Sequence, residues 1–155
     1  MTTGQAQIRL LRAKIHDADG VHQVMNGVVA DGGPQRNGID RMVTPDSVAQ
    51  WIRDLGERGA LFLARVGERA AGAAALEPTA EPDAARLRVW VLPQFRRMGL
   101  GTELGQAATQ FARERGYKRV IGHVPEGNEP ALSYFSTVAG LTNLQPESLR
   151  FELPL

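Results

Sequence analysis

The sequence of 155 residues contains no cysteine. Disulfide bonds, thiolate metal sites and cysteine nucleophiles are therefore excluded. The sequence also lacks an excess of charge of either sign, because 18 basic residues face 17 acidic ones and the formal net charge at pH 7 is +1. Nucleic acids and anionic membrane surfaces attract strongly basic proteins, so this balance predicts neither as a partner.

Long apolar runs are missing as well. No stretch approaches the roughly 18 consecutive apolar residues that a membrane-spanning helix needs, and the first residues lack the apolar segment of a signal peptide. Three scattered histidines, with no carboxylate at ligand spacing, predict no metal site. We therefore expect a soluble, cytoplasmic protein without a metal, folded as a single domain over residues 1–155.

Strand and helix patterns alternate along the chain. Alternating or continuous apolar residues predict strands at residues 8–13, 61–66, 70–76, 86–92, 117–124, 141–144 and 149–153. Apolar residues three or four positions apart predict helices after Asp17 or Asp19, after Thr44 as N-cap with Pro45 behind it, at residues 100–115 and at residues 128–138. Residues 31–38 and 77–85 are rich in turn formers and are expected to be loops. This order predicts a mixed α+β fold.

Residues 91–102 carry the strongest functional signal. A hydrophobic strand leads into a loop that contains Arg96, Arg97, Gly99 and Gly101, and an amphipathic helix follows. The glycines let the main chain turn tightly and approach a ligand closely. The helix start offers unpaired N–H groups and the positive end of the helix dipole, and the arginines supply donors that match phosphate oxygens. The pattern predicts a pyrophosphate-binding loop, although loop arginines are often merely solvated.

The chain resembles the GNAT superfamily of acyl-CoA-dependent N-acyltransferases. The superfamily signature, Arg/Gln-x-x-Gly-x-Gly/Ala between the fourth strand and the third helix, is matched by Arg96, Gly99 and Gly101. A second feature, Asn-x-x-Ala after the fifth strand, is matched by Asn128 and Ala131. The predicted order of elements is also that of the superfamily. The resemblance implies the GNAT fold, a central twisted mixed sheet flanked by helices on both faces.

The resemblance further implies acetyl-CoA, or a related acyl-CoA, as co-substrate. In relatives the main chain of the fourth strand pairs with the pantetheine arm, and the main-chain amides of the glycine loop hold the pyrophosphate. The fourth and fifth strands splay apart to admit the thioester, and the asparagine contacts the pantetheine or lines the acyl channel. The implied cofactor-binding residues are Val89, Trp90, Val91, Arg96, Arg97, Met98, Gly99, Leu100, Gly101, Thr102, Asn128 and Phe135.

Most relatives carry a tyrosine seven positions after the asparagine, where its hydroxyl protonates the leaving thiolate. Here that position is Phe135, and Tyr134 precedes it. One helical step turns a side chain by about 100°, so the two do not face the same way. The spacing to Gly140 is one residue longer than usual, which leaves room for a bulge that would turn Tyr134 into place. Tyr134 is therefore either the general acid or a packing residue; without it, the thiolate leaves unprotonated or takes a proton from water.

The candidate general base is His123. An attacking amine with a pKa of about 10 must lose a proton, and a group that titrates near neutrality suits this task. His123 lies on the predicted fifth strand, five residues before Asn128, and some N-terminal-amine acetyltransferases of the superfamily carry a glutamate there. The alternative is a merely hydrogen-bonded strand histidine. The acids predicted to lie in loops are less favoured and expected to be solvated: Glu77, Glu81, Asp83 and Glu126.

Acceptors in the superfamily bind around the first two helices, and here the mixed charges of that region indicate no particular one. Arg88 and Trp90 alternate away from the core face and border this region, with Trp90 expected to be buried against a helix.

The sequence thus predicts an N-acetyltransferase that moves acetyl from acetyl-CoA to a primary amine of a small molecule or protein. Two alternatives stay open: an acyl-CoA-binding regulatory module without turnover, favoured by Phe135, and a nucleotide-binding protein, which lacks the expected Gly-Lys-Ser/Thr. Because many relatives dimerise, the resemblance also points to a homodimer.

Overall fold

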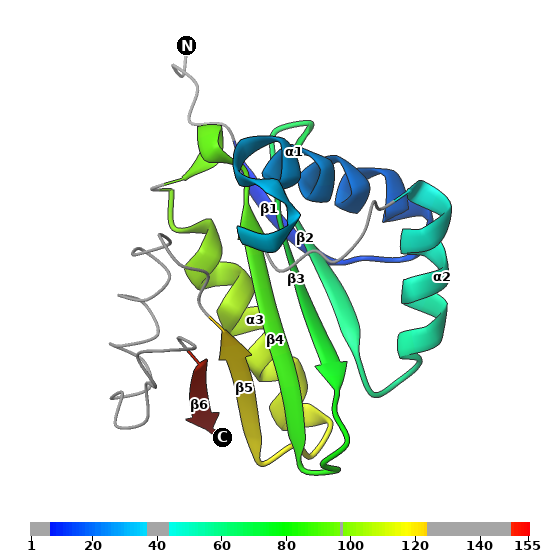
Figure 1. Ribbon diagram of the computed structural model, residues 1–155, viewed down its shortest axis with the longest axis vertical. Helices are drawn as coiled ribbons and strands as arrows, with labels where there is room; N and C mark the ends of the chain where they lie inside the picture. Colours follow the sequence, from blue (N-terminus) through cyan, green and yellow to red (C-terminus); the bar gives the residue numbers. More distant parts are fainter. Residues whose placement is uncertain (1–6, 37–43, 97, 124–149) are drawn as a thin grey trace.

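The structure is a computed structural model, and it describes residues 7–36, 44–96, 98–123 and 150–155 (Figure 1). Within these residues six strands form one sheet in the order β1-β2-β3-β4-β5-β6. The strands are β1 (Ile8–Arg12), β2 (Ala60–Val66), β3 (Arg69–Pro78), β4 (Ala84–Val91), β5 (Arg119–His123) and β6 (Arg150–Pro154). Strands β4 and β5 pair in parallel, and the other neighbours pair antiparallel.

Helices cover both faces of the sheet. Helices α1 (Ala18–Arg36) and α2 (Pro45–Leu55) lie on one face, and α3 (Leu100–Glu114) lies on the other (Figure 1). Two single turns of 3-10 helix, η1 (Ile15–Asp17) and η2 (Pro93–Phe95), precede α1 and α3. The predicted mixed α+β architecture, with a mixed sheet between helices, is confirmed.

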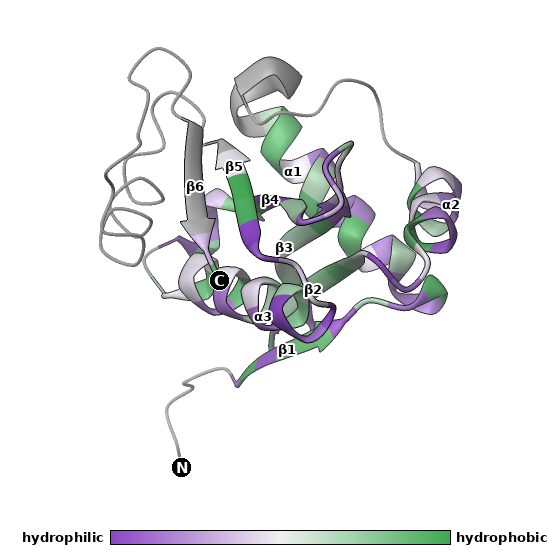
Figure 2. Ribbon diagram, turned by 90° about the horizontal axis from the view of Figure 1, so that it is seen from below, coloured by the Kyte–Doolittle hydropathy of each residue, from purple (hydrophilic) through white to green (hydrophobic). Residues whose placement is uncertain are grey.

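The middle strands form the centre of the core. Every residue of β3 from Ala70 to Leu76 is buried, and Figure 2 shows β2 and β3 mostly green between the helices. This stretch is rich in alanine, which has a weak preference for strands, but burial on both faces outweighs that preference. Small residues also let α3 approach closely, because a Cβ on Gly72 would lie 3.0 Å from Leu104 Cδ1 and 3.0 Å from the carbonyl oxygen of Trp90.

Helix α2 begins as the sequence predicts. Thr44 is its N-cap and Pro45 its first residue. The Ser47 amide donates to Thr44 Oγ1 at 3.1 Å, and the Thr44 amide donates to Ser47 Oγ at 2.9 Å. Two otherwise unpaired amides at the helix start are thereby satisfied reciprocally. The apolar face of the helix turns inward, since Val48 and Leu55 are buried.

Two predicted loops, at residues 31–38 and 77–85, differ from the structure. Helix α1 continues through residues 31–36, where a loop was expected, so the turn-forming glycines and Pro34 lie in the last two turns of this helix. The loop predicted at residues 77–85 is shorter, because β3 runs to Pro78 and β4 begins at Ala84. Strand β6 confirms the strand expected near residues 149–153, whereas residues 128–138 and 141–144 lie outside the described residues.

Candidate functional site

The glycine loop connects β4 to α3 through η2. Gly99 is the N-cap of α3 and has φ of 80°, a left-handed conformation that glycine adopts without a steric cost. At the helix start, the Glu103 amide donates to the Gly99 carbonyl oxygen at 3.1 Å. The amides of Leu100, Gly101 and Thr102 precede that bond and are directed out of the helix start. They form a donor group suited to an anion.

At position 101, neither the main-chain conformation nor a crowded described neighbour demands a glycine. It lies in the first turn of α3, and its φ is not among the positive ones. A Cβ placed on it would meet only Val91 Cγ2, at 3.9 Å, which is an ordinary contact. Among the described residues, therefore, the space over the Gly101 main chain is open. A ligand that approaches the amides closely would explain a glycine here.

Strand β4 passes beside this loop and extends beyond its pairing with β5. The described ladder between β4 and β5 ends at Leu87 and Gly122, whereas the ladder between β3 and β4 continues to Val91. Beyond His123 the fifth strand lies outside the described residues, so the separation of the fourth and fifth strands stays a prediction. Since Val91 lies next to Gly101, the end of β4 and the start of α3 border the same region.

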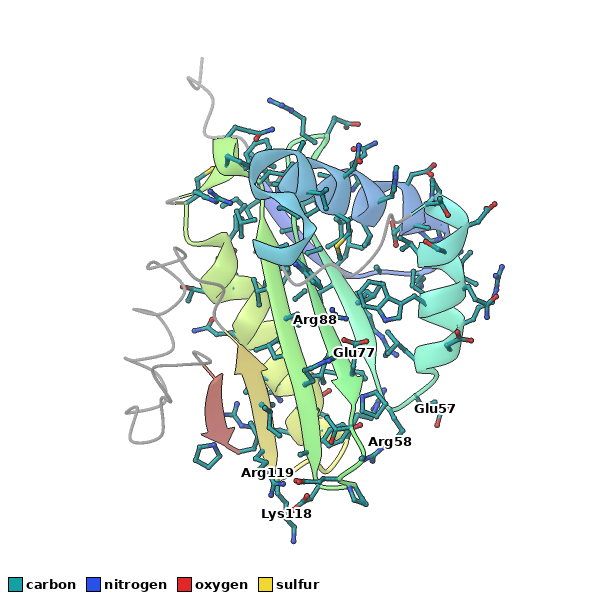
Figure 3. All side chains as sticks on the ribbon, in the orientation of Figure 1. Glu57, Arg58, Glu77, Arg88, Lys118 and Arg119 are labelled. Carbon is teal, nitrogen blue, oxygen red and sulfur yellow. The ribbon has the colours of Figure 1, made fainter. Side chains whose placement is uncertain are left out.

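On the opposite face of the sheet, Glu77 is the centre of a hydrogen-bonded network (Figure 3). Its side chain is 15% exposed. Glu77 Oε1 accepts from Arg88 Nε at 3.0 Å, from Arg88 Nη2 at 2.5 Å and from Arg86 Nη2 at 3.2 Å. Glu77 Oε2 accepts from Trp51 Nε1 of α2 at 3.2 Å. The prediction of a solvated loop acid was wrong, because Glu77 belongs to β3 and lies directly opposite Arg86 on β4.

Two tryptophans flank the guanidinium of Arg88. The rings of Trp51 and Trp90 meet edge to face, with centroids 6.4 Å apart. The Arg88 Cζ lies 5.5 Å from the Trp51 centroid and 5.3 Å from the Trp90 centroid, within cation–π range. Trp90 is buried against a helix, as expected. Sequence reasoning missed this cluster, and the signal for it was the pair Arg86 and Arg88 on one face of a strand, opposite an acid in a hairpin.

The other predicted site residues are distributed as follows. Arg96 and Met98 are exposed, Thr102 is half-buried and Leu100 is buried, so Leu100 can serve a ligand only through its main chain. His123 is the last residue of β5, but its side chain is not among those described. Residues outside the description are Arg97, Glu126, Asn128, Tyr134 and Phe135.

Two of the remaining acids pair with the same arginine. Glu81 and Asp83, in the loop between β3 and β4, both form ion pairs with Arg119 of β5. In the described part of the chain, no group of three or more histidine, aspartate or glutamate residues is arranged to hold a metal ion. Within the same residues, no helix is both long and apolar enough to cross a membrane.

Comparison with known protein families assigns the chain to one of them. The sequence matches the model of the acetyltransferase (GNAT) family over residues 33–140, which includes the whole glycine loop. The chain belongs to the GNAT acetyltransferase family. The resemblance drawn from Arg96, Gly99 and Gly101 is confirmed, and so is the prediction of an acyltransferase enzyme of the GNAT type. No curated protein sequence matches the chain.

Solved structures of the family share the fold. The GNAT acetyltransferase of Streptococcus pneumoniae is 15% identical, with a TM-score of 0.76 over 93% of this chain and 95% of that one. An N-acetyltransferase of Staphylococcus aureus is 13% identical, with a TM-score of 0.76 over 96% of this chain and 98% of that one. The paia N-acetyltransferase of Thermoplasma acidophilum, solved with coenzyme A, is 17% identical, with a TM-score of 0.67 over 96% and 99%. At these identities the likeness establishes the fold.

Proposed function

We propose that this GNAT enzyme transfers an acetyl group from acetyl-CoA to a primary amine of a small molecule or a protein by direct attack. The observation that carries the proposal is the space that the described residues leave open over Gly101, at the start of α3 and beside Val91. A glycine with room above it, among amides that precede the helix ladder, fits a diphosphate held by main-chain donors. The complex of the Thermoplasma relative with coenzyme A supports the same ligand.

The binding roles follow from this placement. Amides of residues 97–102 would donate to the pyrophosphate, and Arg96 and Arg97 would add charge and donors. The main chain of residues 89–91 would bond the pantetheine arm, because β4 continues there past its described ladder with β5. Asn128 and Phe135 would line the acyl end.

The chemistry is an acyl transfer between a thioester and an amine. The amine nitrogen forms a bond to the thioester carbonyl carbon, the carbon–sulfur bond breaks, and coenzyme A leaves as the thiolate. His123 would take the proton that the amine must lose, directly or through a water. The thiolate would be protonated by Tyr134 or by water. Holding both reactants in place supplies much of the rate increase.

The test combines a binding and a turnover measurement on the full chain. Isothermal titration with acetyl-CoA, with ATP as comparison ligand, is paired with a thiol-release assay over a panel of amines. We expect saturable binding of acetyl-CoA, weak or no binding of ATP, and thiol release that depends on an amine.

A second candidate function is an acyl-CoA-binding regulatory module, which the phenylalanine at position 135 favours. Binding of acetyl-CoA without thiol release from any amine would support that module and contradict the transferase. A preference for ATP over acetyl-CoA would contradict both.

A further inference from the structure

The carboxylate of Glu77 is shared by two arginines of β4. Arg86 and Arg88 both direct their guanidinium groups at the same oxygen, Oε1, where three N–H donors converge. A carboxylate offers about two lone-pair sites on each oxygen. Arg88 contributes two of the donors, at 3.0 and 2.5 Å, and its side chain is 24% exposed. The Glu77 charge is therefore engaged mainly by Arg88.

Arg86 is the outer member of the cluster. Its Nη2 contacts Glu77 Oε1 at 3.2 Å, longer than either Arg88 contact, and its side chain is 47% exposed. The Glu77 carboxylate is itself fixed by Trp51 at its other oxygen. Among the described residues, Arg86 thus contacts Glu77 through Nη2 alone and remains about half exposed, so other donors of its planar fork can reach a second carboxylate.

The position of Arg86 relates it to the transfer site. Arg86 is opposite Ile121 in the β4–β5 ladder, and the described part of that ladder ends one residue later, at Leu87. Its neighbour on the same face, Arg88, contacts Trp51 of α2, so this face is covered by α1 and α2. Helix α3, whose start would hold the diphosphate, lies on the other face. In the proposed transfer, an amine that approached the thioester from the α1–α2 face would come from the side on which Arg86 lies.

We propose that Arg86, held in place by Glu77, binds a carboxylate on the acceptor. The preferred acceptors are then small molecules that carry both a primary amine and a carboxylate, as amino acids do. A second cation at this place, as in a polyamine, would be repelled by the Arg86 guanidinium. This inference rests on the proposed acetyl transfer to amines, and the alternative is a purely structural ion pair.

Matched acceptors test the proposal. Thiol release is measured over concentration series of several amino acids and of their primary amides, which have the same side chains without the carboxylate. The α-amine of an amino-acid amide is less basic than that of the free amino acid, so more of it is unprotonated at neutral pH. Amine reactivity alone would therefore favour the amides as acceptors. We expect the reverse, with KM roughly tenfold or more lower for the acids, as a charged hydrogen bond supports.

Variants assign the preference to Arg86. Arg86→Gln should raise KM for the acids roughly tenfold, leave kcat and the amide KM nearly unchanged, and leave the KM of acetyl-CoA unchanged. For Arg86→Lys, the KM for the acids should lie between those of the wild type and Arg86→Gln, because lysine keeps the charge and loses the planar fork. Arg113→Gln, an exposed arginine of α3, is the matched control and should behave as the wild type.

Each outcome decides the inference. Equal KM for acids and amides, or an Arg86→Gln effect on both alike, would overturn it while leaving the transferase intact. If no amine releases thiol, the proposed function fails, and acceptor binding is then scored by calorimetry on protein saturated with coenzyme A. Amino acids that bind the wild type but not Arg86→Gln would still support the carboxylate site, and no binding would overturn it.

Discussion

At the scale of single residues, Gly101 carries the most specific expectation. Gly101→Glu places a carboxylate and extra bulk over the amides that would hold the diphosphate. The carboxylate of the variant and the diphosphate would lie within a few ångströms of each other, where two like charges repel by about 1–2 kcal/mol or more. The affinity for acetyl-CoA should therefore fall about tenfold or more. Isothermal titration measures this loss. The matched variant Gly101→Ala adds only a methyl group, at 3.9 Å from Val91 Cγ2, and should lose less affinity.

Both Gly101 variants should melt near the wild-type temperature, because glycine is unfavourable within a helix and no described neighbour is crowded. Retained acetyl-CoA affinity in a folded Gly101→Glu protein would show that the diphosphate lies elsewhere.

His123 is the second residue with a distinct expectation. A histidine base works only when it is unprotonated, so kcat/KM should rise with pH through an ionisation near the imidazole pKa of about 6.5. His123→Ala should lower kcat by about 100-fold and remove that rising limb. The control is His16→Ala, whose side chain is 76% exposed, and it should leave the profile intact. An unchanged profile in His123→Ala would make His123 a structural residue.

At the scale of elements, the start of α2 matters because this helix brings Trp51 to Glu77. Thr44→Ala removes the hydroxyl that accepts from the Ser47 amide, and such a loss costs about 1 kcal/mol. For a chain of this length the melting temperature should fall by about 2–4 °C. Thermal unfolding measures the shift.

Ser47→Ala provides the comparison for the cap, since it removes the reciprocal bond to the Thr44 amide but leaves the Thr44 hydroxyl in place. Its effect should be smaller. An equal or larger loss in Ser47→Ala would mean that Ser47 contributes more to the helix start than Thr44 does.

At the scale of the whole molecule, side-chain contacts link three loop segments at the end of the sheet away from the glycine loop. Arg58 lies over the Tyr117 ring at 4.2 Å, and the Tyr117 hydroxyl donates to the Arg58 carbonyl oxygen at 2.8 Å. Arg58 also donates to the carbonyl oxygens of Arg115 at 3.2 Å and Pro82 at 3.0 Å. Figure 3 shows Arg58 at the same end of the molecule as Lys118 and Arg119. These contacts connect the segments after α2, β3 and α3.

Tyr117→Phe keeps the ring beneath Arg58 and removes the hydroxyl donor. The free energy of unfolding should fall by about 1 kcal/mol, the usual value of one such hydrogen bond, and denaturant titration measures it. Tyr117→Ala also removes the buried ring and should cost about 3 kcal/mol or more. Acetyl-CoA affinity should be unchanged in Tyr117→Phe, because the length of α3, about 20 Å, separates the two ends. A loss of affinity without a loss of stability would contradict this separation.

The amino-acid sequence by itself determined the features that depend on neighbouring residues. The cap at Thr44, the glycine turn before α3, the alternation along β4 and the family all follow from local patterns, because main-chain preferences and helix starts act over a few residues. The tertiary structure alone decided which distant groups meet. Glu77 was expected in solvent, and only the β3–β4 register places it beneath two arginines and a tryptophan. Likewise, the space that the described residues leave over Gly101, and the end of the described β4–β5 ladder at Leu87, exist only in the folded sheet, because both arise from packing between segments that are far apart in the chain.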